Sequence, residues 1–409
     1  MKYIILLGDG MADYPLEQLG GRTPLDIART PNMDRIAAEG TIGRVDTIPA
    51  GFKPGSDVAN LSVLGYDPAA CYAGRGPLEA ANMGVQIGPD DVAFRCNLVT
   101  LGPERDPVMV DYSAGHISTE EAARIVTDMD RAIGSPEFRF YPGISYRHLL
   151  VWRNGKDALE TTPPHDITGQ PTAAYRIKGD GADRLALLMQ QSRIFLQDHP
   201  VNLARRAEGN NPATSIWLWG QGRAPRMVRL TDQYNLRGGV ISAVDLLNGI
   251  GVCAGLEVIR VPGATGYIDT NYVGKAQYAL QALQDVDFMF VHVEAPDEMA
   301  HAGNLEGKIQ AIEDFDAKVV GTVLEGLLKF DDYRVMVLSD HPTPLATKTH
   351  ASDPSPFAVL SSAKEENLGR GLAFNEADAR AGGILVSPGY GLMDRFIRNW
   401  RRFIEEERQ

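Results

Sequence analysis

Acidic and histidine residues recur in three places between residues 297 and 350: Asp297 with His301, Asp340 with His341, and then His350. Carboxylate and neutral imidazole groups are ligands for divalent cations, and Asp297 and His301, four residues apart, share one face if the segment is helical. Asp340 and His341 follow an apolar run, which indicates the carboxyl end of a buried strand, where α/β enzymes place their sites. A lone histidine there is more often a hydrogen-bonded structural residue, but three such elements in order favour a metal site.

Two further side chains, in the first sixty residues, are candidates for the same site. The apolar run from residue 3 to 7 ends at Asp9 between two glycines, which indicates a ligand at a strand end, with a turn aspartate as the alternative. A short helical pattern opens on Ser56 after Pro54 and Gly55, so its hydroxyl is expected at a helix N-terminus, where N–H groups favour an anion. The commonest role for such a serine is an N-cap, and that alternative stays open.

Composition limits the class of protein. A chain of 409 residues has room for about two or three domains. The net charge of −13 argues against binding to nucleic acid or to an anionic membrane, so an anionic substrate would need local arginines or a metal. Cys71, Cys96 and Cys253 are too few and too widely spaced for a disulfide framework, which favours a reducing cytoplasm. The N-terminal apolar run is too short for a signal or a membrane span.

Strand and helix signals alternate along both ends of the chain. Strands are expected at 257–261, 288–293, 334–338 and 357–360, with helical stretches at 241–247 and near 307–329. This alternation predicts an α/β fold with a mostly parallel sheet covered on both faces. Between about residues 70 and 230 the pattern changes, with more glycine and proline and no acid or histidine at strand ends, which is consistent with an inserted domain.

The combined motifs resemble those of a known superfamily. Asp9, the segments 30–35 and 55–62, and the residues Asp297, His301, Asp340, His341 and His350 occur in the order and approximate spacing of the alkaline phosphatase superfamily. Within it, the chain resembles the archaeal-type cofactor-independent phosphoglycerate mutases, over residues 1 to about 360. The resemblance includes the stretches 72–84, 94–100, 263–272 and 312–316, and those from residue 72 to 100 and from 263 to 272 narrow it to this branch.

The resemblance implies an alkaline-phosphatase-like three-layer α/β fold carrying a smaller inserted α/β (α+β) domain. The metal-binding phosphotransferase domain would comprise residues 1–70 and 230–409, and the insert, residues 71–229, would close over it and contribute substrate contacts. One metal would be held by Ser56, Asp9, Asp340 and His341, and the second by Asp297, His301 and His350. Two divalent ions are therefore expected, Mn²⁺ first, although such ligands also suit Mg²⁺, Zn²⁺ and Co²⁺.

The implied activity is an intramolecular phosphoryl transfer that interconverts 3-phosphoglycerate and 2-phosphoglycerate, with Ser56 as nucleophile and a small phosphorylated hydroxy acid as the only partner class. A homoserine kinase-like enzyme, or another metal-dependent phosphotransferase or phosphatase of this superfamily, is the chief alternative, because the metal core is common to them all. A catalytically inactive metal-binding module is the third, and the intact Ser56 and metal-ligand set argues against it. The oligomeric state is left open, with a homo-oligomer among the alternatives.

Arginines are the expected ligands of the substrate phosphate and carboxylate, because their planar donor fork suits both. Arg223 and Arg226 have the spacing of the arginine pair that clamps substrate in the bacterial branch; weaker candidates are Arg75, Arg95 and Arg147, each of which also fits a surface arginine. His165 and Asp166 are candidates for proton transfer to the glycerate hydroxyls, with a turn-capping aspartate as the alternative, and His116 is a further substrate candidate. His292 is interpreted as a packed strand residue. The bacterial substrate lysine has no counterpart at 262–269.

Overall fold

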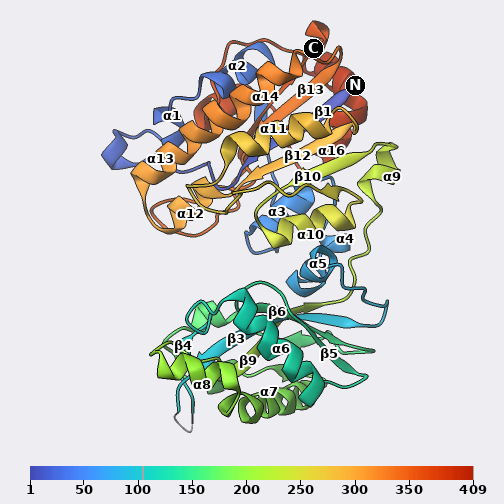
Figure 1. Ribbon diagram of the computed structural model, residues 1–409. Coiled ribbons are helices and arrows are strands. Elements are labelled where there is room, and N and C mark those ends of the chain that lie inside the picture. Colours follow the sequence, from blue (N-terminus) through green and yellow to red (C-terminus); the bar gives the residue numbers. More distant parts are fainter. Residues whose placement is uncertain (104–105, 409) are drawn as a thin grey trace. The chain divides into compact units, whose positions relative to one another are not determined.

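The computed structural model describes residues 1–103 and 106–408, which fold into two compact units. The first unit joins Met1–Tyr72 to Arg226–Gln409, and the second is Ala73–Pro225 (Figure 1). From the sequence, the boundaries of the insert are expected at 70/71 and 229/230. Over the described residues, no helix is long and apolar enough to cross a membrane.

The first unit is built on an eight-stranded sheet of order β11-β10-β12-β1-β13-β14-β2-β15. Neighbouring strands are parallel except where β14 pairs antiparallel with β13 and β2. The strands are β1 Lys2–Gly8, β2 Thr41–Val45, β10 Gly238–Ile241, β11 Glu257–Val258, β12 Phe288–Val293, β13 Tyr333–Leu338, β14 Ser355–Ser361 and β15 Leu385–Val386. The central strands β12, β1 and β13 are almost wholly buried, which explains why their sequences are continuous apolar runs instead of alternating patterns.

Helices cover both faces of this sheet. Ile4 and Leu6 of β1 face a core formed with α1, α2, α11, α13, α14 and α15, whereas Tyr3 points to the other face and packs edge-on against Phe396. On that second face α10 packs against Val240 and contacts α3. The helices of this unit are α1 Pro24–Ile27, α2 Pro31–Glu39, α3 Ser56–Val63, α4 Pro68–Cys71, α9 Leu230–Tyr234, α10 Asp245–Cys253, α11 Tyr272–Ala282, α12 Ala295–His301, α13 Leu305–Asp314, α14 Gly321–Leu327, α15 Glu376–Ala381, α16 Gly391–Asp394 and α17 Trp400–Glu407. The predicted α/β fold class is confirmed.

Two predicted helical stretches differ from the structure. The expected helix at 241–247 is wrong, because Ile241 ends strand β10 and the helix that follows begins only at Asp245. The apolar residues of β10 pair with β12 and are buried between two layers, so tertiary pairing overrides the local pattern. The helix expected near 307–329 is divided into α13 and α14 by a π-helical turn at Phe315–Val320.

The second unit has a five-stranded antiparallel sheet in which β3 is central, paired with β4, β6 and β9, while β5 extends it beyond β6. Its elements are β3 Val92–Leu101, β4 Met109–Asp111, β5 Phe138–Tyr141, β6 Arg147–Trp152 and β9 Ser215–Gly222, with a separate pair β7 Leu159–Glu160 and β8 Lys178–Gly179, and helices α5 Arg75–Asn82, α6 Thr119–Ile133, α7 Ala182–Gln197 and α8 Pro200–Ala207. Ser118 caps α6 through a capping box with Glu121.

The two faces of this second sheet differ in chemistry because side chains alternate along β3. Phe94, Cys96 and Leu98 point into an apolar core beneath α6, α7 and α8. Arg95 and Asn97 point to the opposite face, where the cross-strand register adds Arg147 of β6 and Trp219 of β9. One face of the insert is therefore polar and basic, and it collects substrate candidates from distant parts of the sequence.

Candidate active site

The predicted metal ligands gather at the carboxyl ends of the central parallel strands of the first unit. Asp9 follows β1, Asp340 and His341 follow β13, and α12 begins two residues after β12. Because these strands are adjacent and parallel, their ends meet at one edge of the sheet. Ser56 is the first residue of α3, and Gly55 takes the N-cap position.

The first cluster contains Asp9, Asp340, His341 and Ser56. The Nε2 atom of His341 lies 3.2 Å from Ser56 Oγ and 3.5 Å from both Asp9 Oδ1 and Asp340 Oδ2. Apart from Ser56 these side chains are at most 1 % exposed. Burial and the neighbouring Asp340 carboxylate raise the pKa of Asp9 well above its ordinary value, as expected for two buried acids that share a place for a cation.

The second cluster contains Asp297, His301 and His350, and α12 places the first two on one face as predicted. The two histidine Nε2 atoms are 2.9 Å apart, and each faces a carboxylate oxygen of Asp297, at 3.1 Å for His301 and 3.5 Å for His350. His301 Nδ1 lies 2.9 Å from the Lys348 carbonyl, so Nδ1–H donates there and Nε2 is the nitrogen that can bind a cation once it has lost its proton. The two Nε2 atoms and the Asp297 carboxylate thus converge on one point.

Thr343 joins the two clusters. Its hydroxyl lies 2.6 Å from Asp297 Oδ1 and 3.2 Å from His341 Nδ1, so it donates to the carboxylate and accepts the imidazole N–H. This assignment leaves the lone pair of His341 Nε2 directed at the first cluster. The His341 and His350 ring centroids are 4.3 Å apart, so the two clusters are neighbours.

The ligand atoms of the two clusters suit divalent metal ions. Asp9 Oδ1 is buried without a hydrogen-bond partner in the described structure, and it faces the same point as the lone pair of His341 Nε2. Carboxylate, imidazole and hydroxyl donors without thiolates suit hard and borderline cations. The chain therefore carries two adjacent groups of residues that can hold divalent metal ions.

Residues around the ligands fix their orientation. Asp9 Oδ2 lies 2.9 Å from His292 Nε2, and the Nδ1 atom of that ring lies 3.1 Å from Ser242 Oγ. Burial lowers the pKa of His292 to about 3, so its neutral ring accepts the serine proton and donates to Asp9. Asn60 donates to Asp340 Oδ2 and to the Ser56 carbonyl, which ties the start of α3 to the end of β13.

The second unit brings most of the predicted substrate residues into one group, here called the arginine cluster: Arg75, Arg95, Arg147, His116 and His165, arranged with the aromatic rings of Trp219, Tyr112 and Tyr146. The Arg95 guanidinium is centred 4.6 Å from the Trp219 ring and forms a buried 3.0 Å ion pair with Glu79. Burial lowers the pKa of Arg95, and repulsion from Arg75 and Arg147 lowers it further. Three cations around one carboxylate make this face suited to an anion.

His165 and His116 occupy different backbone settings within this cluster. His165 lies in the 3₁₀ turn Pro164–Ile167, and burial lowers its pKa, with Arg75 and Arg95 adding to the effect, so the ring is neutral near pH 7. Asp166 lies 3.5 Å from His165 Nε2. His116 ends a run of three residues with positive φ that starts at Ala114, a backbone conformation that is costly for non-glycine residues and concentrates at functional sites.

Arg223 and Arg226 are placed differently from the other candidates. Arg223 donates to Asp157, with Nε 3.0 Å from Oδ2, and to the Gly155 carbonyl. Arg226 is exposed and belongs to the first unit, whereas Arg223 belongs to the second. Their joint clamp on a substrate stays a prediction.

Comparisons with known proteins show the family of this chain. A family model described as 2,3-bisphosphoglycerate-independent phosphoglycerate mutase matches residues 37–202. A Geobacter sulfurreducens protein named as a probable enzyme of this type is 56 % identical, with 97 % of this chain and 100 % of that protein covered. The chain belongs to the 2,3-bisphosphoglycerate-independent phosphoglycerate mutase family. A Methanosarcina barkeri mutase is 54 % identical over 94 % of this chain and 96 % of its own length.

Two solved structures resemble this family member in fold. A Pyrococcus horikoshii protein superposes with a TM-score of 0.82 at 28 % identity, with 98 % of this chain and 97 % of that chain covered. A cofactor-independent phosphoglycerate mutase from Thermoplasma acidophilum has a TM-score of 0.66 at 27 % identity, with 97 % and 99 % covered. The predicted family is confirmed.

Sequence reasoning missed several residues of this mutase site. Asn60 lies four residues after Ser56, so helical spacing was the signal that would have placed it on the same face. His292 was interpreted as a packed strand residue, but the parallel register sets it opposite Leu7, two residues before Asp9. Thr343 carries no motif, and only the folded chain brings it to the two metal-ligand clusters. Within the second unit, only the fold shows that Glu79 and Trp219 contact Arg95.

We predict that Thr343→Val weakens metal binding about 10- to 100-fold, the usual effect of removing a group that orients a ligand. The valine removes the hydroxyl that sets the tautomer of His341 and holds Asp297. Competition with a chromogenic chelator measures the affinity. Thr343→Ser keeps the hydroxyl and should bind as the wild type does, so equal loss in both variants would contradict this role.

We also predict that metal binding to the second cluster releases protons near neutral pH. The hydrogen bond to Asp297 raises the pKa of His301 from 6.5 to about 9 in the metal-free protein. Because this folded-state pKa is raised, the charged pair stabilises the metal-free fold fully below about pH 6.5 and loses that effect as the pH rises through about 9. Metal affinity should therefore increase with pH up to about 9.

Calorimetry in two buffers of different ionisation enthalpy measures the number of protons released. His301→Gln should release fewer protons than the wild type at pH 7. An identical proton count in the variant would show that His301 does not carry the released proton.

Proposed function

We propose that this chain interconverts 3-phosphoglycerate and 2-phosphoglycerate through a phosphoserine formed on Ser56. The observation that carries the proposal is the position of Ser56 Oγ, 3.2 Å from His341 Nε2, at the start of α3 and beside two metal-competent clusters. Its family relatives are named as mutases, and they do not favour the homoserine kinase alternative.

The proposed ligands are Ser56, Asp9, Asp340 and His341 for one metal ion, and Asp297, His301 and His350 for the other, with Mn²⁺ as the native metal. When bound, two such ions lower the pKa of a hydroxyl ligand and neutralise charge on a phosphoryl group. Asn60 donates to the Ser56 carbonyl and to the Asp340 carboxylate, so it holds the backbone at Ser56 next to one of the proposed ligands. The N-terminal N–H groups of α3 favour the anionic phosphoryl group that arrives there.

The proposed reaction has two balanced transfers. In the first, Ser56 Oγ forms a bond to phosphorus, the bond to the 3-oxygen of glycerate breaks, and the serine proton passes to that oxygen. In the second, the 2-oxygen of the retained glycerate forms a bond to phosphorus, the bond from phosphorus to Ser56 Oγ breaks, and the proton of the 2-hydroxyl passes to Ser56 Oγ, which regenerates the serine. His165 and Asp166 are the proposed groups for moving the glycerate protons, because the His165 ring is neutral and so can accept one.

The second unit is proposed as the substrate-binding domain and lid. Arg75, Arg95 and Arg147 supply the positive charge that a phosphorylated hydroxy acid requires, and Glu79 with Trp219 holds Arg95 in place. His116, Arg223 and Arg226 stay proposed substrate contacts. Retaining glycerate while water is excluded is what distinguishes a mutase from a phosphatase. Three free cysteines support the proposed cytoplasmic location.

An enolase-coupled assay with 3-phosphoglycerate and Mn²⁺ tests the function, run beside ATP with homoserine under the same conditions. The proposal expects turnover in the first assay and none in the second. Kinase activity without mutase activity would overturn it, and steady release of inorganic phosphate without 2-phosphoglycerate would make the chain a phosphatase.

A further inference from the structure

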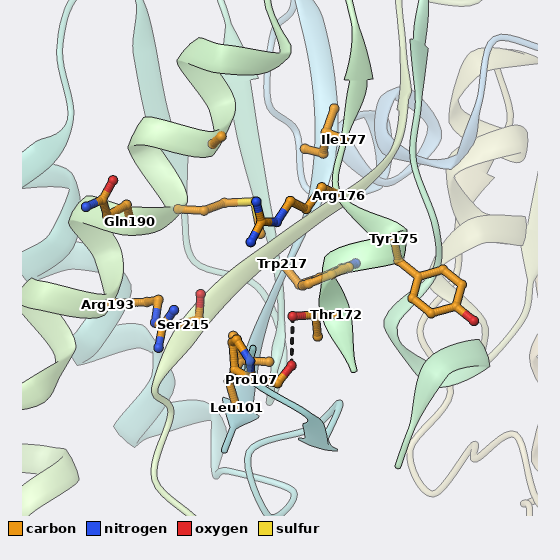
Figure 2. Close-up of a pocket in the computed structure, with 12 residues that line it drawn as sticks. Leu101, Pro107, Thr172, Tyr175, Arg176, Ile177, Gln190, Arg193, Ser215 and Trp217 are labelled. Carbon is orange, nitrogen blue, oxygen red and sulfur yellow. Dashed lines mark hydrogen bonds between the residues drawn. The ribbon is translucent and has the colours of Figure 1, made fainter. Parts of the chain in front are cut away.

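A cavity of about 310 Å³ lies wholly within the second unit, and none of the residues assigned above lines it. Its walls are helix α7, the start of β9 and the segment from the 3₁₀ turn Thr172–Tyr175 to Ile177 (Figure 2). Its volume falls at the lower end of the range of small-molecule pockets, about 300–1,000 Å³. The pocket therefore has room for a compact organic molecule.

The pocket combines an apolar floor with positive charge. Trp217 and Leu101, both over 90 % buried, form the floor together with Met189. Arg176 and Arg193 approach from separate walls, the first after the 3₁₀ turn and the second on α7 (Figure 2). Within residues 1–103 and 106–408, neither guanidinium has an ion-pair partner, and none of the described lining residues is acidic.

Among the described residues, Arg176 and Arg193 are exposed arginines without acidic partners, and they can attract an anion although the net charge of the chain is −13. An apolar body lying on Trp217 and Met189 would be removed from water, while an acidic group at its end would reach the guanidinium donors. We propose that this pocket binds a small organic acid with an apolar or aromatic body.

The pocket is connected to the segment that carries His165 and Asp166. Trp217 Nε1 donates to the Thr162 carbonyl at 2.8 Å, before that segment. After it, the Tyr175 hydroxyl donates to the Gln170 side chain, whose amide donates to the Asp166 carbonyl at 3.3 Å. Ile167 packs in the same apolar group as Trp217. A ligand on Trp217 and Tyr175 therefore touches both anchors of the His165 turn.

The bound acid would act as an effector that changes the position of His165. This consequence rests on the proposed mutase function, whereas binding itself does not. Occupancy should change KM for 3-phosphoglycerate or kcat by about fivefold or more, because coupling between distinct sites is typically about 5- to 150-fold.

Isothermal titration of the Mn²⁺-loaded full chain with 3-phenylpropionate tests the site. One equivalent should bind, and binding should persist with saturating 3-phosphoglycerate. The neutral analogue 3-phenylpropan-1-ol and inorganic phosphate should each bind at least about tenfold more weakly. The alcohol lacks the acidic group, and phosphate lacks the apolar body. Equal binding of either analogue, displacement by 3-phosphoglycerate, or no heat up to millimolar concentrations would overturn the proposal.

Variants separate this pocket from the rest of the surface. Arg176→Gln and Arg193→Gln should each weaken 3-phenylpropionate binding about three- to tenfold, and Ala186→Phe should block it by filling the pocket mouth. Arg124→Gln removes the same charge from an exposed position on α6 and should bind like the wild type. Equal affinity in all four variants would overturn the assignment. These binding results stand even if the chain lacks mutase activity; binding without any kinetic change would overturn only the effector role.

Discussion

Ser56→Ala is expected to abolish mutase activity, with kcat reduced by about four orders of magnitude or more. Ser56 Oγ is the proposed phosphoryl acceptor, and it lies 3.2 Å from His341 Nε2 at the N-terminus of α3. Alanine removes the acceptor oxygen while it keeps the helix, because the N-cap position belongs to Gly55. The enolase-coupled assay measures the loss, and ³²P from labelled substrate should be trapped on the wild type but not on the variant.

Ser62→Ala is a matched control on the same helix. The Ser62 hydroxyl is buried and has no hydrogen-bond partner in the described structure, so its removal leaves no group of the site unpaired. This variant should keep both its activity and the label on Ser56. Turnover retained in Ser56→Ala would refute the phosphoserine relay.

Removal of divalent metal is expected to eliminate activity and to lower thermal stability together. In the metal-free protein, burial and Asp340 raise the pKa of Asp9 well above its ordinary value, because two buried carboxylates have no cation between them. A bound cation favours the folded state by about 2.7 kcal/mol for each site when its concentration is 100 times Kd. Dialysis against a chelator, followed by return of Mn²⁺, Mg²⁺, Zn²⁺ or Co²⁺, measures both effects by turnover and by Tm.

Asp9→Asn should lose most of the Tm increase on metal addition. Asp331→Asn is the charge-matched control, since Asp331 is exposed and precedes the amino end of β13, whereas Asp340 follows its carboxyl end, and it should respond as the wild type does. Full activity in protein shown by elemental analysis to contain no divalent metal would disprove the metal mechanism. Restoration by Mg²⁺ but not Mn²⁺ would instead correct the proposed native metal.

The sequence by itself determined which residues end the central strands and which residue opens the helix beside them. Asp9 and Asp340 follow apolar runs that are nearly fully buried in the structure, and Asp297 and His301 lie one helical turn apart. These signals are local: burial on both faces demands continuous apolar residues, and helical spacing sets the shared face. Parallel strands bring such ends together, so these residues are close in space although far apart in the chain.

The orientation and support of the site were decided only by the tertiary structure. His292 became a partner of Asp9 through strand register, and Thr343 joined the two clusters through a loop that has no recognisable motif. Ile241 similarly became a strand residue because β12 offered a pairing partner. Each of these outcomes depends on which segments pair across hundreds of residues, and that choice is made by long-range packing.

The substrate side illustrates the same division. Arginines could be chosen from the sequence for their donor geometry, but alternation along β3 and the pairing of β6 and β9 selected Arg95 and Arg147 for one face of the insert. Arg223 carried the stronger motif and instead pairs with Asp157. Residue type therefore determined the kind of chemistry, whereas the fold decided which residues meet, because hydrogen bonds and ion pairs form only between groups that packing brings within reach.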